Sequence, residues 1–222
     1  MDDRKIQILI DSLLPMIKAA LHYTITLALI SFALGLVLAV VVALVRLWKI
    51  PVLSQIAGIY VWIIRGTPLL VQLFIIFYGL PNIGIEFDPF SAAIIAFSLN
   101  MGAYNSEVVR GAIQSISNGQ WEAAYSLGMT RGQALWRIIL PQAARVSVPP
   151  LSNSFISLVK DTSLAFTITV IDMFQVAKQI VSTTYESLLV YSEVAVLYLV
   201  ICTVLNALQS VMEKRLARFS TR

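Results

Sequence analysis

The positions at which this chain could do chemistry are four ionisable residues that lie within otherwise apolar stretches. They are Arg65, Glu107, Lys160 and Asp161. A charged side chain near the centre of a bilayer costs about 2.5–3.5 kcal/mol on insertion scales, so such groups usually face a cavity or one another. Two positive and two negative charges permit pairing within one buried polar pocket. The alternative is that they form structural ion pairs only, or that Arg65 and Glu107 lie near the inner interface.

The sequence Arg65-Gly66-Thr67-Pro68 predicts a broken helix. Pro68 has no N–H and would leave the Ile64 carbonyl without its helical partner, and Gly66 weakens the same turn. We predict a second half-helix with Thr67 as its N-cap and Pro68 at its first position. Backbone amides at such a start attract anions, and broken helices mark substrate sites in transporters. An amino acid's α-carboxylate would suit this position, with Arg65 nearby. A helix that is merely kinked at Pro68 is the competing interpretation.

Two further groups of polar residues could complete such a site. Three of them recur at spacings of four and three, so one helix can direct all of them to the same place: Asn100, Tyr104 and Glu107. The other group follows Lys160. There, Asp161 would balance an α-ammonium group, and Thr162 and Ser163 would cap a second break.

Long runs without charge indicate a membrane protein. A spanning helix needs about 20 largely apolar residues, and residues 19–45, 66–85, 89–106 and 194–212 supply such runs. A fifth stretch, residues 146–171, is interrupted by Lys160 and Asp161. A soluble helical bundle would instead need polar stripes at helical spacing, which these runs lack. We therefore predict an all-α integral membrane protein of one domain, residues 1–222, with five transmembrane helices over residues 16–47, 52–80, 89–113, 142–171 and 188–216.

The charge distribution predicts which end of each helix faces the cytoplasm. With the N-terminus outside and the C-terminus cytoplasmic, ten basic residues lie inside and four outside, as the positive-inside rule requires. The inner set is Arg46, Lys49, Arg110, Arg131, Arg137, Arg145, Lys214, Arg215, Arg218 and Arg222; the outer set is Arg4, Lys5, Lys18 and Lys178. The net charge of +4 is thus explained by topology, and no nucleic-acid partner is needed.

A polar inner loop over residues 117–141 predicts two short helices that meet at Gly128. Asn118 can cap the first helix, and the helix dipole favours Glu122 near its first turn. Ala123 and Ala124 give that helix a narrow face that could enter a cleft on a second protein. An ordinary solvated loop is the alternative.

The second half of this loop would return the chain to the membrane. Gly128 permits a left-handed turn, and Thr130 can start the next helix. Three apolar residues would pack that helix onto the membrane domain: Leu135, Ile138 and Ile139. Pro141 would form the corner. The chain has no phosphate-binding loop of the Walker type, so energy for transport would come from a partner or an ion gradient.

This loop resembles the one by which permeases of ATP-binding-cassette (ABC) importers dock their ATPase. The resemblance rests on Glu122-Ala-Ala, followed after three residues by Gly128 and after nine more by Ile-x-Leu140-Pro141. The chain also resembles polar-amino-acid permeases over about residues 15–215. Two further motifs carry this resemblance: Arg65-Gly-Thr-Pro and Leu158-Val-Lys-Asp-Thr-Ser163. The amino-acid sequence of these segments is most similar to that of L-cystine permeases. Permeases for glutamine, arginine and histidine share much of the same sequence. The residues that the resemblance assigns to ATPase docking are Trp121, Glu122, Ala123, Ala124, Gly128, Leu140 and Pro141.

The resemblance implies a type I importer architecture in a bacterial cytoplasmic membrane, with alternating access. It implies a second permease subunit, expected to form a homodimer, and an ATPase dimer that holds the ATP and Mg²⁺. An extracytoplasmic amino-acid-binding protein would deliver the solute. The chain itself would have no enzymatic activity, metal or cofactor. Two rivals remain: an ion-gradient-driven secondary transporter and a non-transporting membrane scaffold.

Overall fold

The computed structural model describes residues 3–217, and every regular element in that range is helical. Arg218 and Arg222, on which part of the topology prediction rests, lie outside the described residues. The elements are α1 (Asp3–Ala19), η1 (Ala20–Thr24), α2 (Ile25–Leu47), α3 (Leu53–Gly66), α4 (Leu69–Phe74), η2 (Ile75–Gly79), η3 (Leu80–Ile83), α5 (Pro89–Gln114), α6 (Asn118–Ser126), α7 (Arg131–Ala134), η4 (Leu135–Ile139), α8 (Leu140–Asp161), η5 (Thr162–Ile168), α9 (Met173–Thr184) and α10 (Ser187–Ala217).

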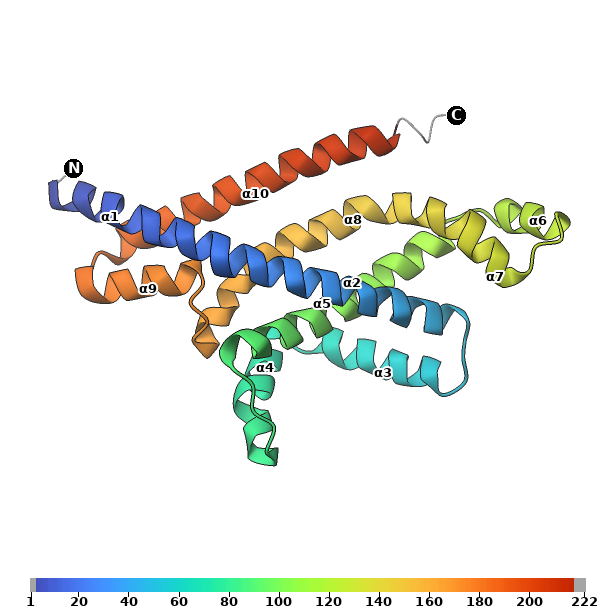
Figure 1. The fold of residues 1–222 in the computed structure, drawn as a ribbon, viewed down its shortest axis with the longest axis horizontal. Coiled ribbons are helices and arrows are strands. Elements are labelled where there is room, and N and C mark those ends of the chain that lie inside the picture. The colour runs from blue at the N-terminus through green and yellow to red at the C-terminus, as the bar shows by residue number, and fades with distance from the viewer. Residues whose placement is uncertain (1–2, 218–222) are drawn as a thin grey trace.

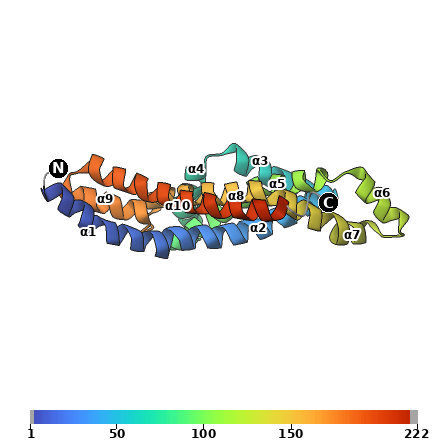
Figure 2. The same ribbon diagram turned by 90° about the horizontal axis from the view of Figure 1, so that it is seen from above.

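The molecule is elongated, and its long helices run roughly along one axis (Figure 1). The α6 and α7 helices lie at one end, while the start of α1 and the whole of α9 lie at the other. The α4 helix points across the long axis, away from its neighbours (Figure 1). Seen from above, the same helices form a narrow slab (Figure 2). The loop expected to dock a partner is therefore at the opposite end from the N-terminal helix.

The centre of the fold is the pair α2 and α5, which approach closely at two glycines. A Cβ atom on Gly35 would lie 2.7 Å from the Met101 Cβ and 3.1 Å from the Ser98 carbonyl oxygen. A Cβ atom on Gly102 would lie 2.7 Å from Leu38 and 2.8 Å from the Tyr60 hydroxyl. Small residues let helix backbones pack closely in membranes. Gly102 is therefore explained by packing between α2, α3 and α5.

We expect Gly35→Ala to destabilise the protein by about 1–3 kcal/mol, because the added methyl group meets the α5 backbone and a Cβ rather than a flexible side chain. Gly58 on α3 is the matched control, since a Cβ there would meet nothing within 4 Å. Gly58→Ala should be neutral or slightly stabilising because alanine favours helix. The midpoint of thermal unfolding in detergent measures both variants. Equal midpoints for the two would contradict this packing.

The first helix begins earlier than expected. Helix continues from Asp3 to Leu47 through Pro15, with a π turn at η1, instead of starting at residue 16. Contacts with the far end of the chain hold the extra turns: Ser12 donates to Glu193 at 2.6 Å, and Lys5 pairs with Glu186 at 3.8 Å. Met16 is buried with residues of α9 and α10. Local sequence gives no sign of these long-range partners.

Two of the other expected helices are interrupted, and two agree closely. The α5 and α10 helices match the expected ranges 89–113 and 188–216. The expected helix 52–80 is instead α3 followed by a segment bent by 108°. The expected helix 142–171 is α-helical only to Asp161 and continues as the 3-10 turns of η5, which end at Thr169 in a left-handed conformation, φ 65°.

Within residues 3–217, two helices are long and apolar enough to cross a membrane, or four if each bent pair counts as one span. The single helices are Asp3–Leu47 and Ser187–Arg215. The α5 helix is not among them, although it has 26 residues. It carries buried polar residues such as Asn100, Asn105 and Ser106, and it packs against the neighbouring helices α2, α3, α4 and α8. The fold is therefore an all-helical membrane protein whose central helix does not need to be strongly apolar.

Candidate functional site

The expected helix break lies at Thr67 and Pro68. Both residues are extended, with ψ 145° and 139°, between the end of α3 and the start of α4. Thr67 does not cap α4 as expected: its hydroxyl donates to the Ile63 carbonyl at 2.9 Å, and Pro68 occupies the N-cap position. The break is confirmed and the capping residue is wrong.

A buried side chain that sequence reasoning missed, Gln72 on α4, satisfies the carbonyls exposed by this break. The two hydrogens of its Nε2 are shared among three acceptors, namely the Ile64 carbonyl at 2.8 Å, the Thr67 carbonyl at 3.0 Å and the Thr67 hydroxyl at 2.9 Å. Its Oε1 accepts a hydrogen bond from Asn100 Nδ2 at 3.1 Å. Asn100 is buried, so it supports the break instead of facing an accessible site as expected. The only local signal was a glutamine shortly after a proline in an apolar run.

Arg65 of α3 and Tyr104 of α5 are brought together in the fold. The Arg65 guanidinium lies 5.4 Å from the centroid of the Tyr104 ring, a distance at which the ring face attracts a cation. Arg65, Gly66, Thr67 and Pro68 are all exposed in the single chain, and 43% of Tyr104 is exposed. A charged group and an open backbone break therefore occupy the same face.

Glu107 has charged partners of its own. Its carboxylate forms ion pairs with Arg46 of α2 and Arg110 of α5, and Arg110 also donates to Gln114 at 3.0 Å. These are the structural ion pairs that were the alternative interpretation of Glu107, and its place in a solute site with Tyr104 stays a prediction. One of these partners, Arg46, comes from the neighbouring helix α2, so the spacing of residues along α5 could not identify this ion pair.

Lys160 and Ser163 line a cavity of 330 Å³ at the junction of α8, α9 and α10. The other lining residues are Phe174, Tyr191, Val194, Ala195 and Tyr198. Phe174 and Tyr191 stack with their ring centroids 5.6 Å apart. A cationic group beside aromatic rings suits a small ligand that carries both a carboxylate and an apolar part. The aromatic residues come from other helices, so the local sequence around Lys160 could not identify them.

Thr162 and Asp161 differ from expectation in this region. Thr162 is fully buried, and its hydroxyl donates to the Val159 carbonyl at 2.8 Å, so it caps no second break. Asp161 is half-buried at the end of α8. Within residues 3–217, no recorded hydrogen bond or ion pair joins Asp161 to Arg65. The two regions meet through α4 and η5, which are in contact, and the Tyr78 hydroxyl donates to the Thr167 carbonyl at 3.1 Å.

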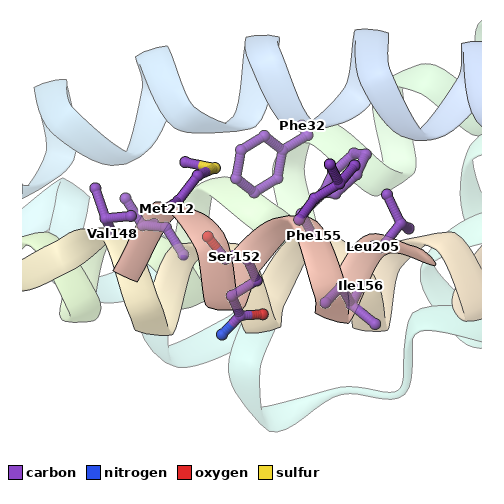
Figure 3. A pocket seen from close by; sticks show the side chains of 10 residues that line it. Phe32, Val148, Ser152, Phe155, Ile156, Leu205 and Met212 are labelled. Atoms are coloured by element: carbon purple, nitrogen blue, oxygen red, sulfur yellow. The ribbon is translucent and has the colours of Figure 1, made fainter. Parts of the chain in front are cut away.

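A second cavity, of 340 Å³, lies between α2, α8 and α10 and is lined almost entirely by apolar side chains (Figure 3). Phe32 and Phe155 meet edge to face with centroids 5.2 Å apart. Ser152 and Gln209 are the polar residues of its lining. A site without charged groups offers little to a zwitterionic solute, so this cavity is not the candidate solute site.

The inner loop has the turn chemistry that the sequence predicted, with one exception. Gly128 is left-handed at φ 77°, and Met129 N–H donates to the Ala124 carbonyl at 3.1 Å, as at many helix C-termini. Thr130 and Gln133 form a reciprocal capping box at the start of α7. The exception is Asn118, which is the first residue of α6; Ser117 occupies the N-cap position, and its side chain makes no cap hydrogen bond.

The loop packs on α2 and α5 through one face and exposes the other. Leu135 and Ile139 are buried against residues of α2 and α5, and Trp121, Ile138 and Leu140 pack around them. Ala124 is only 3% exposed, so it faces inward instead of toward a partner. The exposed face comprises Glu122, Ala123, Tyr125, Leu127 and Gly128, with Leu127 78% exposed.

Pro141 does not form a corner. The chain stays helical from Arg131 to Ile168. The π turn of η4 comes directly before α8, and Pro141 lies in the first turn of α8. The loop over residues 117–141 is therefore joined to the Lys160 region by helical turns without a break.

An elongated helical bundle, a broken apolar helix and an exposed loop over residues 117–141 are features of membrane transport proteins. A sequence profile described as "Binding-protein-dependent transport system inner membrane component" matches residues 35–218, and the chain belongs to this family. It is a multi-pass permease of an ABC transporter and is not itself catalytic. The resemblance to amino-acid permeases that the motifs indicated is confirmed.

Particular relatives are similar over nearly the whole chain. The L-cystine transport system permease protein TcyB of Bacillus subtilis (strain 168) is 51% identical over 206 residues, covering 92% of this chain and 88% of that protein. The nopaline transport system permease protein NocM of Agrobacterium fabrum is 43% identical, covering 94% and 90%. A crystal structure of an amino acid ABC transporter with histidines is 33% identical with a TM-score of 0.88, covering 93% and 96%.

Proposed function

We propose that this chain is the membrane-spanning subunit of an ATP-driven importer of L-cystine. Its 51% identity to an L-cystine permease supports this solute, while the 43% identity to a nopaline permease makes a different amino-acid derivative the alternative. The observation that carries the transport proposal is the exposed break at Arg65–Pro68 within an apolar helix pair. Irregular backbone at membrane depth is tolerated only where protein or water covers it. We therefore propose that the break faces the second subunit and the solute pathway between the two copies rather than lipid.

The residues proposed to meet the solute are those around this break and the Lys160 cavity. Arg65 and Lys160 would attract the carboxylates, Asp161 would attract an ammonium group, and Tyr104 and Ser163 would complete the walls. Gly66, Thr67 and Pro68 supply the open backbone. Asn100, Glu107 and Thr162 would act indirectly, because each is held by other side chains or buried.

Coupling to ATP would use the exposed face of α6. Glu122, Ala123 and Gly128 belong to the docking motif, and the exposed Tyr125 and Leu127 extend it. Because residues Arg131–Ile168 form one helix, a displacement of the loop would move Lys160 and Ser163 with it. ATP-driven closure of the ATPase dimer would thereby reorient the solute site between the two sides of the membrane.

The proposed partners are an ATPase dimer that holds ATP and Mg²⁺, an extracytoplasmic binding protein, and a second copy of this chain. A second copy would cover the exposed break and enclose the pathway. Five spans are proposed, with the N-terminus outside: α6 and α7 lie at the opposite end from α1 (Figure 1), and the basic residues gather at the α6 end. A membrane-impermeant thiol reagent applied to intact cells should label Asp11→Cys and not Ser126→Cys in a Cys202→Ser chain; the reverse pattern would refute this topology.

The solute is tested by uptake of labelled cystine into cells that express the whole system, with a panel of unlabelled competitors. We expect cystine to compete far better than glutamine, arginine, histidine or nopaline. If any of these four compounds competed more strongly than cystine, that compound would be the solute in place of cystine. A system that takes up none of them would refute the proposed transport function.

A further inference from the structure

Gln72 combines strong burial with an unusual density of hydrogen bonds. It is 7% exposed and lies in the first turns of α4 beside Leu73, which is fully buried. All of its recorded partners lie at the helix break or on α5. A polar side chain in such an apolar setting is favourable only when its hydrogen bonds are satisfied.

The break creates the acceptors that Gln72 satisfies. Pro68 has no N–H to offer the Ile64 carbonyl, and the extended Thr67 leaves its own carbonyl outside helical hydrogen bonding. Both carbonyls would be costly in a membrane interior without a donor. The carboxamide of Gln72 donates to each, so it takes the place of the backbone donors that the proline removes.

Asn100 holds the other side of the same carboxamide. Its Nδ2 donates to Gln72 Oε1, which leaves Nε2 directed at the carbonyls of Ile64 and Thr67. Two contacts flank this connection: the Tyr60 hydroxyl donates to the Leu99 carbonyl, and Arg65 lies over Tyr104. The hydrogen bonds of Gln72 therefore fix the orientation of α4 relative to both α3 and α5.

We propose that Gln72 is a positioning residue for transport: it fixes the bend between α3 and α4 and so keeps Arg65 and the exposed break aligned with Tyr104. This inference rests on the proposed function, since it assumes that the break faces the solute. It predicts that loss of Gln72 leaves an assembled complex that hydrolyses ATP but moves little solute per ATP.

The test uses the complete complex of permease, ATPase and binding protein in proteoliposomes, with uptake and ATP hydrolysis measured together. Gln72→Leu removes all of these hydrogen bonds, and Gln72→Glu keeps the acceptor but offers at most one hydrogen where the amide offers two. We expect both variants to lower uptake per ATP by at least about tenfold. Gln55→Leu, which changes an exposed glutamine on α3, should leave this ratio unchanged.

Either of two results would overturn the proposal: a Gln72→Leu ratio within about twofold of the wild-type ratio, or a parallel fall of uptake and hydrolysis, which indicates a structural role alone. A second measurement does not depend on the solute. A spin label at Val71→Cys in a Cys202→Ser chain should become more mobile when Gln72 is leucine, and unchanged mobility would also overturn the proposal. If the wild-type complex transports no amino acid, the proposed function fails, and the label still decides whether Gln72 holds α4.

Discussion

Replacing Glu122 with lysine is expected to abolish ATP-driven uptake, with a loss of about 100-fold or more, because a reversed charge in a protein interface costs several kcal/mol. Glu122 is exposed on α6, on the face that the packing of Leu135 and Ile139 leaves free. The substitution touches no buried contact, so the chain should still fold and enter the membrane. Uptake of labelled solute and co-purification of the ATPase measure the two parts of the prediction.

Matched variants separate docking from a general effect of charge. Glu86→Lys makes the same reversal on the exposed loop before α5 and should leave ATPase association intact. Glu122→Gln removes the charge while keeping the shape, and we expect an intermediate loss. Normal association and normal uptake in Glu122→Lys would contradict the assignment of α6 as the docking element.

Arg65→Ala is expected to lower uptake by roughly 10- to 100-fold, since hydrogen bonds to a charged group contribute about 1.5–3 kcal/mol. Arg65 is exposed at the break and lies over Tyr104, so the guanidinium is available to a solute carboxylate. Its removal should not disturb the core, because no recorded hydrogen bond of residues 3–217 uses it. The initial rate of uptake at saturating binding protein measures this effect.

Conservative variants of the same pair define what the arginine supplies. Arg65→Lys keeps the charge but loses the planar group that stacks on a ring and grips a carboxylate with two bonds, so we expect only partial recovery. Tyr104→Phe keeps the ring and should retain most activity, whereas Tyr104→Leu should not. Full uptake by Arg65→Ala would remove this residue from the solute site.

Features that depend on local chemistry could be predicted from the sequence. The break at Pro68 follows from a missing N–H, and the turn at Gly128 and the cap at Thr130 follow from residue-specific backbone preferences. The α5 and α10 helices follow from runs of apolar residues. The contact of Arg65 with the Tyr104 ring was not predicted, because the two residues come from different helices.

Features that depend on partners distant in the sequence could not be predicted. Glu107 is held by Arg46, 61 residues away, and the N-terminal turns of α1 are held by Glu186 and Glu193. Asn100 is buried because Gln72 accepts its hydrogen bond. Pro141 illustrates a different limit: a proline suggested a corner, but a π turn before it lets one helix continue.

Reconstitution tests the central claim, that this chain carries solute but takes its energy from an ATPase docked on α6. Proteoliposomes that contain the permease, its ATPase and the binding protein should accumulate cystine against a gradient when ATP is present. The same vesicles should fail with Glu122→Lys, and vesicles that contain the permease alone should fail under an imposed proton or sodium gradient. Uphill uptake by the permease alone, driven by an ion gradient, would contradict the account.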